Sequence, residues 1–105
     1  MSDPLFEGLS AFPLTPITST GVDAARYAGL VERMQAAGVD SISALGSTGS
    51  YAYLDVAERA SVAKLTVQHA GPVPVIVGIG ALRTRDVLEN LRSAEDAGAA
   101  AVLLA

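Results

Sequence analysis

Apolar residues follow two patterns that alternate along the chain. Short, nearly continuous apolar runs are separated by longer stretches in which apolar residues recur every three or four positions. The first pattern is typical of buried strands and the second of helices that bury one face. The predicted strands are a brief one within residues 9–16, which is stopped by prolines and runs into a loop, and residues 40–45, 74–77 and 100–104, with helices between them. The order β-α-β-α-β-α-β favours a parallel sheet, because parallel neighbours need a crossover long enough to hold a helix.

Residues that commonly begin and end helices lie at the expected helix boundaries. Asp23 and Thr84 are predicted N-caps, and Asp55 with Glu58 three residues later matches a capping box. A glycine stands at the C-terminal boundary of each helix, at intervals close to one βα unit: Gly38, Gly71 and Gly98. This spacing fits both a (β/α)8 barrel and an open doubly wound sheet, and periodicity does not choose between them.

Each predicted helix has an apolar stripe that we expect to be buried against the sheet. The stripes are Tyr27, Leu30, Met34 and Ala37 in the first helix; Val56, Ala60, Ala63, Val67 and Ala70 in the second; and Val87 or Leu88, Leu91, Ala94 and Gly98 in the third.

The composition argues against several classes of protein. Half of the 105 residues are apolar and 17% are charged, so the chain can fill a packed core, and its length indicates one domain at most. The net charge of −4 argues against a nucleic-acid partner, which needs a positive surface. The longest apolar stretches, residues 73–82 and 97–105, are too short for a membrane-spanning helix, which needs about 20 apolar residues. We therefore expect no membrane partner.

The sequence offers neither a disulfide framework nor a metal-ligand spacing. It has no cysteine, a single histidine (His69) and scattered acidic residues. Its first residues lack the positive and apolar segments of a signal peptide. We therefore expect a cytoplasmic protein that binds no metal.

The last predicted strand, residues 100–104, is apolar and is not followed by a helix. An uncovered apolar sheet edge promotes aggregation, and complete proteins avoid one. A (β/α)8 barrel also needs about 250 residues. We therefore expect the chain to be a fragment of a longer protein.

A glycine-flanked hydroxyl loop, Gly46–Ser50, follows the second predicted strand. In such a loop backbone N–H groups converge and hydroxyls add donors, an arrangement suited to a carboxylate or phosphate. The loop falls at the C-terminal end of a parallel strand, where barrels and open α/β sheets bind ligands. The alternative is a tight strand-to-helix turn in which these residues supply only conformational freedom. Tyr51 and Tyr53 follow, either at the mouth of the loop or in packing contacts with a neighbouring chain.

Other candidate motifs fail on their residues. No lysine follows Gly49, so the loop is not a Walker motif. Gly78-Ile79-Gly80 supplies two glycines of a dinucleotide fingerprint, but Arg83 stands where the third is needed. We expect Lys64 to be solvated on its helix, and His69 to complement the dipole at a helix C-terminus.

The chain resembles the dihydrodipicolinate synthase / N-acetylneuraminate lyase family, and the matching segments run in order over nearly all 105 residues. They are Phe6-Glu7-Gly8, Ala11–Pro16, Gly21–Asp23, Gly38–Ile42, Gly46–Gly49, Leu54, Glu58-Arg59, Pro74–Gly80 and Thr84. The resemblance favours the barrel over the open sheet. It implies that residues 1–105 form the N-terminal β-α-β-α-β-α-β portion of a (β/α)8 barrel domain.

The resemblance also implies a function for the intact protein. Members of the family are lyases and aldolases in which a lysine forms a Schiff base with pyruvate or a related 2-oxo acid. By the family's motif, Ser47 and Thr48 would bind the substrate carboxylate, and Ser47 would take part in a proton relay. Ser50 departs from the glutamate that members often have after the second glycine.

The Schiff-base lysine and the catalytic tyrosine of the family lie on later strands, beyond Ala105. We therefore expect this fragment alone to be inactive. No cofactor is implied, and the expected partners are a small-molecule 2-oxo acid and further copies of the chain in a dimer or tetramer.

Two other hypotheses remain open. The chain could be a self-contained or dimerising α/β half-barrel that binds a ligand without catalysis. It could also belong to a non-catalytic member of the family that binds pyruvate without forming an adduct.

Overall fold

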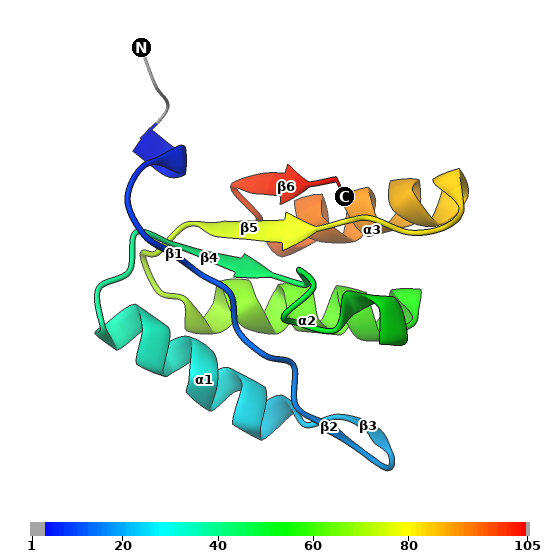
Figure 1. Cartoon of the computed structure of the whole chain (residues 1–105), viewed down its shortest axis with the longest axis horizontal. Helices are drawn as coiled ribbons and strands as arrows, with labels where there is room; N and C mark the ends of the chain where they lie inside the picture. The colour runs from blue at the N-terminus through cyan, green and yellow to red at the C-terminus, as the bar shows by residue number, and fades with distance from the viewer. Residues whose placement is uncertain (1–3, 105) are drawn as a thin grey trace.

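A parallel sheet forms the centre of the computed structural model, which describes residues 4–104. Its four strands are β1 (Ser10–Ala11), β4 (Ser41–Ala44), β5 (Val75–Gly78) and β6 (Ala101–Leu103), hydrogen-bonded in that order (Figure 1). Ile42 pairs with Val75, and Ile76 pairs with Ala101. The spatial order follows the chain order without the reversal that defines a doubly wound sheet, as in the wall of a barrel.

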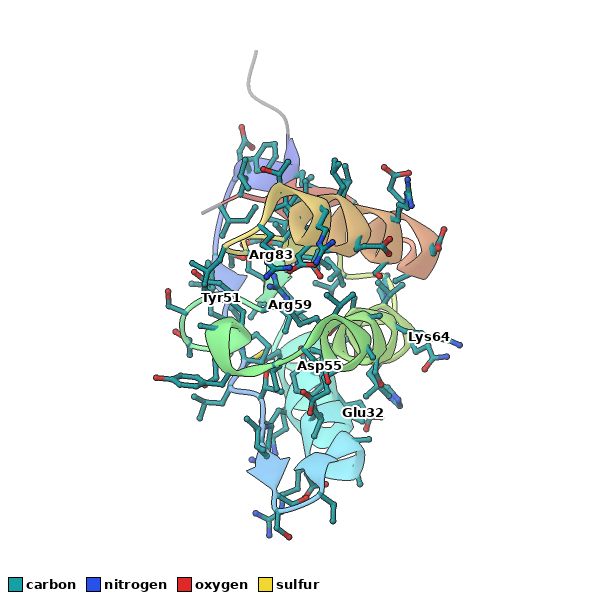
Figure 2. The ribbon with its side chains drawn as sticks, turned by 90° about the vertical axis from the view of Figure 1, so that its right-hand side faces the viewer. Glu32, Tyr51, Asp55, Arg59, Lys64 and Arg83 are labelled. Atoms are coloured by element: carbon teal, nitrogen blue, oxygen red, sulfur yellow. The ribbon has the colours of Figure 1, made fainter. Side chains whose placement is uncertain are left out.

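Helices α1 (Ala24–Ala36), α2 (Val56–His69) and α3 (Thr84–Ala97) lie side by side along one face of the sheet, with α2 in contact with both others (Figures 1 and 2). Ile42 and Ala44 of β4 point into the core between sheet and helices. Because side chains alternate along a strand, Ser41 and Ser43 point to the opposite face. There the Oγ atoms of Ser43 and Ser10 lie 2.7 Å apart.

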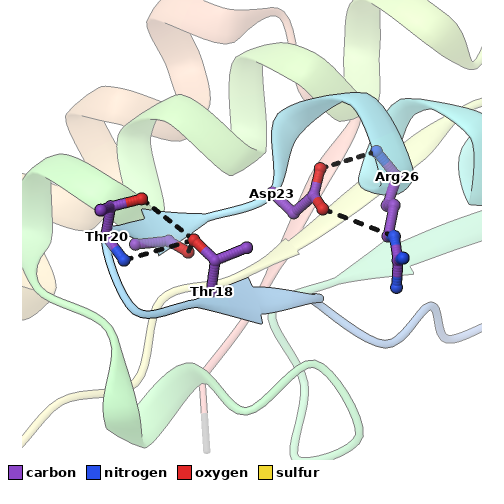
Figure 3. A network of polar contacts seen from close by, with 5 residues as sticks. Thr18, Thr20, Asp23 and Arg26 are labelled. Carbon is purple, nitrogen blue, oxygen red and sulfur yellow. Dashed lines mark hydrogen bonds and ion pairs between the residues drawn. The ribbon is translucent and has the colours of Figure 1, made fainter.

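The prediction of a brief strand that runs into a loop within residues 9–16 is confirmed, because only Ser10 and Ala11 pair with β4. Pro13 and Pro16 have no N–H with which to continue the ladder. The segment instead leads into a small hairpin of β2 (Ile17–Thr18) and β3 (Gly21–Val22), which the sequence pattern does not predict. In its turn, the Thr18 hydroxyl donates to the Gly21 carbonyl at 3.2 Å and accepts from the Thr20 amide at 3.3 Å (Figure 3).

Two of the three predicted N-caps are confirmed. The Asp23 side chain accepts a 3.1 Å bond from the Arg26 amide (Figure 3), and Asp55 and Glu58 form the predicted capping box. The N-cap prediction for Thr84 is wrong, because Arg83 occupies the N-cap of α3 and Thr84 is the first helical residue. The Arg83 backbone is extended, and its carbonyl already accepts the first helical bonds. Positive φ angles follow each helix, as predicted, at Gly38, Gly71 and Gly98.

The predicted buried stripes are partly wrong. The helical residues that are fully buried are Tyr27 and Val31 in α1; Arg59, Val62, Ala63 and Thr66 in α2; and Asn90 and Ala94 in α3. Ala37, Leu88 and Gly98 are exposed instead, and Leu30, Met34, Val56, Ala60, Val67, Val87 and Leu91 are half-buried. In α2 and α3 the buried face differs from the predicted stripe because polar residues occupy some of the innermost positions: Arg59, Thr66 and Asn90. A prediction from apolar residues alone does not place polar residues there.

A buried hydroxyl pair joins α1 to α2. The Tyr27 hydroxyl lies 2.7 Å from Thr66 Oγ1, and the Thr66 hydroxyl donates to the Val62 carbonyl at 2.6 Å. Since the proton of Thr66 is used in that bond, Tyr27 is the donor of the pair. Both side chains are fully buried.

The stability of the chain is expected to fall at alkaline pH through Tyr27. Burial raises the pKa of Tyr27 from 10.0 to about 12, with a smaller opposing effect from the Thr66 hydrogen bond. The unfolded chain therefore releases this proton at lower pH than the folded chain, and stability that is complete below pH 10 is lost as the pH rises toward 12. The loss amounts to roughly 2 to 3 kcal/mol.

Urea unfolding at pH 8 and at pH 11.5 gives the fall in the free energy of unfolding between the two pH values. The contribution of Tyr27 is the part of this fall that wild type shows and Tyr27→Phe does not. Tyr27→Phe is expected to remove most of the decline, whereas Tyr53→Phe, which replaces an exposed tyrosine, is the matched control and retains it. An equally steep decline in wild type and Tyr27→Phe contradicts the prediction.

Candidate functional site

The candidate site is the loop at residues 45–50, which leaves β4 at the carboxyl edge of the sheet (Figure 1). β5 ends at the same edge, and its last residue, Gly78, is followed by Ile79 and Gly80. Ligands of parallel α/β proteins bind at this edge, because the loops that follow the strands gather there. The predicted position of the loop is therefore confirmed.

The backbone of the loop is strained at both ends. Leu45 has φ +60° and Ser50 has φ +58°, left-handed values that cost non-glycine residues of order 1 to 3 kcal/mol each. Between them, the Gly49 amide donates to the Gly46 carbonyl and the Ser50 amide to the Ser47 carbonyl, both at 3.0 Å. Leu45 is buried, so the surrounding protein fixes the start of the loop. Strain of this kind is typical of functional loops.

Ser47 and Thr48 lie at the exposed tip of this loop. Within residues 4–104, neither their backbone amides nor their hydroxyls have a hydrogen-bond partner. Adjacent free N–H and O–H donors on a fixed backbone can bind an anionic group such as a carboxylate without first breaking protein hydrogen bonds. The sequence-predicted substrate-binding residues thus have the chemistry that the prediction requires.

Glycines allow the backbone around the loop to pack closely. A Cβ atom at Gly78 would overlap the carbonyl oxygen of Leu45, and one at Gly49 would lie 3.3 Å from the Pro13 carbonyl oxygen. Gly78 has no positive φ, so close approach and not conformational freedom requires glycine there. The start of the loop therefore rests directly against the end of β5.

Arg59 of α2, to which the sequence assigns no role beyond its place in the family resemblance, contacts residues on both sides of the loop. It is 5% exposed, and its guanidinium donates to the Gly80 carbonyl at 2.6 Å and to the Gly78 carbonyl at 2.9 Å. The guanidinium carbon lies 5.2 Å from the centre of the Tyr51 ring. Burial lowers the pKa of Arg59. The available signal was that Arg59 lies three residues after Val56 and four before Ala63, two residues of the stripe that is predicted to face inward.

The remaining candidates lie away from this edge or make other contacts. Lys64 is exposed on α2, as predicted. Its side chain points away from Arg59 (Figure 2). His69 Nδ1 lies 2.8 Å from Glu32 Oε1 of α1, so its contact is a cross-helix bond. Tyr51 packs against Arg59, whereas Tyr53 is 84% exposed.

Two kinds of feature are absent from residues 4–104. Histidine, aspartate and glutamate side chains form no cluster there that could hold a metal ion. None of the helices in this range is long and apolar enough to cross a membrane.

Comparison with known proteins gives consistent matches over nearly the whole chain. The model of the dihydrodipicolinate synthetase family matches residues 5–105. A 4-hydroxy-tetrahydrodipicolinate synthase from Phenylobacterium zucineum is 38% identical over 105 residues, which are 99% of this chain and 36% of that protein. One from Thioalkalivibrio sulfidiphilus is 41% identical over 102 residues, 95% of this chain and 35% of that protein.

Solved structures agree with these matches. A dihydrodipicolinate synthase from Agrobacterium tumefaciens superposes with a TM-score of 0.91 and 42% identity, over 97% of this chain and 36% of that one. A prophage protein of the dihydrodipicolinic acid synthase family from Escherichia coli K12, solved in complex with pyruvate, gives a TM-score of 0.88 and 32% identity, over 95% and 34% of the two chains. This chain therefore spans about a third of its barrel-shaped relatives, which confirms the predicted fold class.

Proposed function

Because the chain belongs to the dihydrodipicolinate synthetase family, we propose that the intact protein is a Schiff-base-forming lyase or aldolase that acts on pyruvate or a related 2-oxo acid. The coarser assignment, to an enzyme family of lyases and aldolases, follows from the relatives. The pyruvate complex of the Escherichia coli relative supports the choice of substrate class.

We propose that residues 1–105 are the first part of one barrel domain whose later strands supply the lysine and the tyrosine. The lysine amine attacks the ketone of the 2-oxo acid, and loss of water leaves a cationic imine that withdraws electrons from the adjacent carbon. The protein needs no cofactor for this chemistry and is proposed to be a cytoplasmic homo-oligomer, a dimer or tetramer. This chain alone has no lysine for the reaction at the site, so it is expected to be inactive.

In this proposal the Gly46–Ser50 loop binds the carboxylate of the 2-oxo acid. Ser47 and Thr48 donate their hydroxyls and amides to it, which orients the ketone toward the lysine. The Ser47 hydroxyl also passes a proton during imine formation. The observation that carries the assignment is the pair of free hydroxyls on a strained loop at the carboxyl edge of the sheet.

The alternative, a half-barrel module that dimerises and binds without catalysis, is compatible with one observation. Apolar side chains of the edge strand β6 and of the residue after it are exposed: Val102, Leu103 and Leu104. A second copy could cover them, as could the later strands of a barrel.

Borohydride trapping with pyruvate separates these readings. Reduction converts the imine to a stable secondary amine, so mass spectrometry detects one reduced pyruvyl group on a lysine. We expect the adduct on a protein that continues through the whole barrel and none on the 105-residue chain. No adduct on either would overturn the proposed function. Pyruvate binding without trapping would indicate a non-catalytic member of the family.

A further inference from the structure

The buried guanidinium of Arg59 touches segments that lead to both ends of the Gly46–Ser50 loop. On one side it packs against the ring of Tyr51, the residue immediately after Ser50. On the other side it donates to the carbonyl of Gly78. Gly78 in turn lies against the carbonyl of Leu45, the residue immediately before Gly46. Figure 2 shows Arg59 in the interior beside Tyr51, whereas Lys64 of the same helix points outward.

These contacts are poorly suited to a purely stabilising role. No carboxylate within residues 4–104 forms an ion pair with Arg59, and its Nε atom is buried without a hydrogen-bond partner. Burying a charge without an opposite charge is unfavourable, and an unsatisfied donor adds to that cost. A well-packed apolar residue would avoid the cost of the buried charge and would lose only the two bonds to the Gly78 and Gly80 carbonyls.

The contacts are well suited to fixing a distance between two segments. A guanidinium is planar, and its donors have a rigid fork geometry that a lysine ammonium does not have. Here two nitrogens of the fork donate to the carbonyls of Gly80 and Gly78, at 2.6 and 2.9 Å, while the guanidinium carbon lies 5.2 Å from the centre of the Tyr51 ring. Asn90 reinforces the same turn by donating to the Ile79 carbonyl at 3.2 Å.

We propose that Arg59 is a positioning residue that sets the geometry of Ser47 and Thr48 for binding the substrate carboxylate. This inference rests on the proposed function. Arg59 does not reach the substrate itself; it acts by holding the strained loop between Tyr51 and the end of β5. Without it the loop samples other conformations, and substrate binding must select the competent one.

The test compares Arg59→Met with Lys64→Met in the full-length protein, using kcat and KM for pyruvate and the midpoint of thermal unfolding. Both variants remove a cation from α2, but Lys64 is exposed. Because a preformed loop helps the ground state and the transition state alike, KM is expected to rise about tenfold in Arg59→Met with kcat within about twofold of wild type. Lys64→Met is expected to match wild type. Arg59→Lys, which cannot hold both carbonyls in the same geometry, is expected to be intermediate.

Tyr51→Leu and Tyr53→Leu give a second matched pair that does not depend on the folding of Arg59→Met. Tyr51 contacts the guanidinium and Tyr53 is exposed, so only Tyr51→Leu is expected to raise KM. A folded Arg59→Met with unchanged KM and a lower unfolding midpoint overturns the proposal, because that is the signature of a structural role alone. Should Arg59→Met not fold, an unchanged KM in Tyr51→Leu overturns it equally. Wild-type protein that traps no pyruvate overturns the proposed function, and this inference with it.

Discussion

Replacing Gly78 with alanine is expected to lower the free energy of unfolding by at least about 3 kcal/mol, at the upper end of the range for overpacking. The added methyl group would overlap the carbonyl oxygen of Leu45 and would lie 2.9 Å from its carbonyl carbon. Both are backbone atoms at the start of the strained loop, so no side-chain rotation can relieve the overlap. Either β5 or the loop must shift, and the bonds from Arg59 to the Gly78 and Gly80 carbonyls shift with it.

Gly29→Ala is the matched control for Gly78→Ala. Gly29 lies in α1, and a Cβ atom there would meet nothing within 4 Å. Alanine favours helix over glycine, so this variant is expected to gain about 0.5 to 1 kcal/mol of stability. Chemical denaturation of both variants gives the two values. A loss of less than about 1 kcal/mol in Gly78→Ala would show that the carbonyl of Leu45 moves freely, contrary to its close packing against Gly78.

Local features of the fold could be predicted from the sequence because their causes lie within a few residues. The Asp55–Glu58 capping box and the Gly38 helix end depend on neighbours along the chain, and both form as predicted. The position of the Gly46–Ser50 loop also follows from the order of strands and helices, since parallel strands place such loops at one edge. The place of this loop in the fold could therefore be predicted from the pattern alone, whereas its role in binding stays a prediction.

Features that depend on contacts between distant residues could not be predicted in this way. Arg59 is buried because carbonyls about 20 positions later accept its bonds, and a hydrophobic pattern treats an arginine as exposed. Thr66 is buried because Tyr27, in another helix, donates to it. Gly78 needs the absence of a side chain because of Leu45, on the neighbouring segment. In each case the reason lies in tertiary packing that a single sequence does not display.

Replacing Ser47 with alanine and Thr48 with valine together is expected to raise the pyruvate concentration for half-maximal trapping by about 100-fold or more in the full-length protein. Each hydrogen bond to a charged group contributes about 1.5 to 3 kcal/mol, and 1.4 kcal/mol corresponds to a factor of ten. Both side chains are exposed and make no hydrogen bond within residues 4–104, so the unfolding midpoint is expected to remain close to that of wild type. The effect therefore separates binding from folding.

Acetone distinguishes a carboxylate-binding role from a general effect on the lysine, because it has the ketone of pyruvate but no carboxylate. The acetone concentration for half-maximal trapping at equilibrium is expected to be equal in wild type and the double variant, because loss of the Ser47 proton relay slows imine formation without changing its equilibrium. The corresponding pyruvate concentration differs by the factor above. Ser61→Ala, which removes an exposed hydroxyl from α2, is the control for losing a serine and is expected to behave as wild type. If the half-maximal concentrations of acetone and pyruvate rise by the same factor in the double variant, the substitutions impair the reaction of the lysine amine and not the binding of the carboxylate. If the double variant and wild type need the same pyruvate concentration for half-maximal trapping, Ser47 and Thr48 do not bind the carboxylate. Two hydrogen bonds to a carboxylate cannot be lost without weakening its binding.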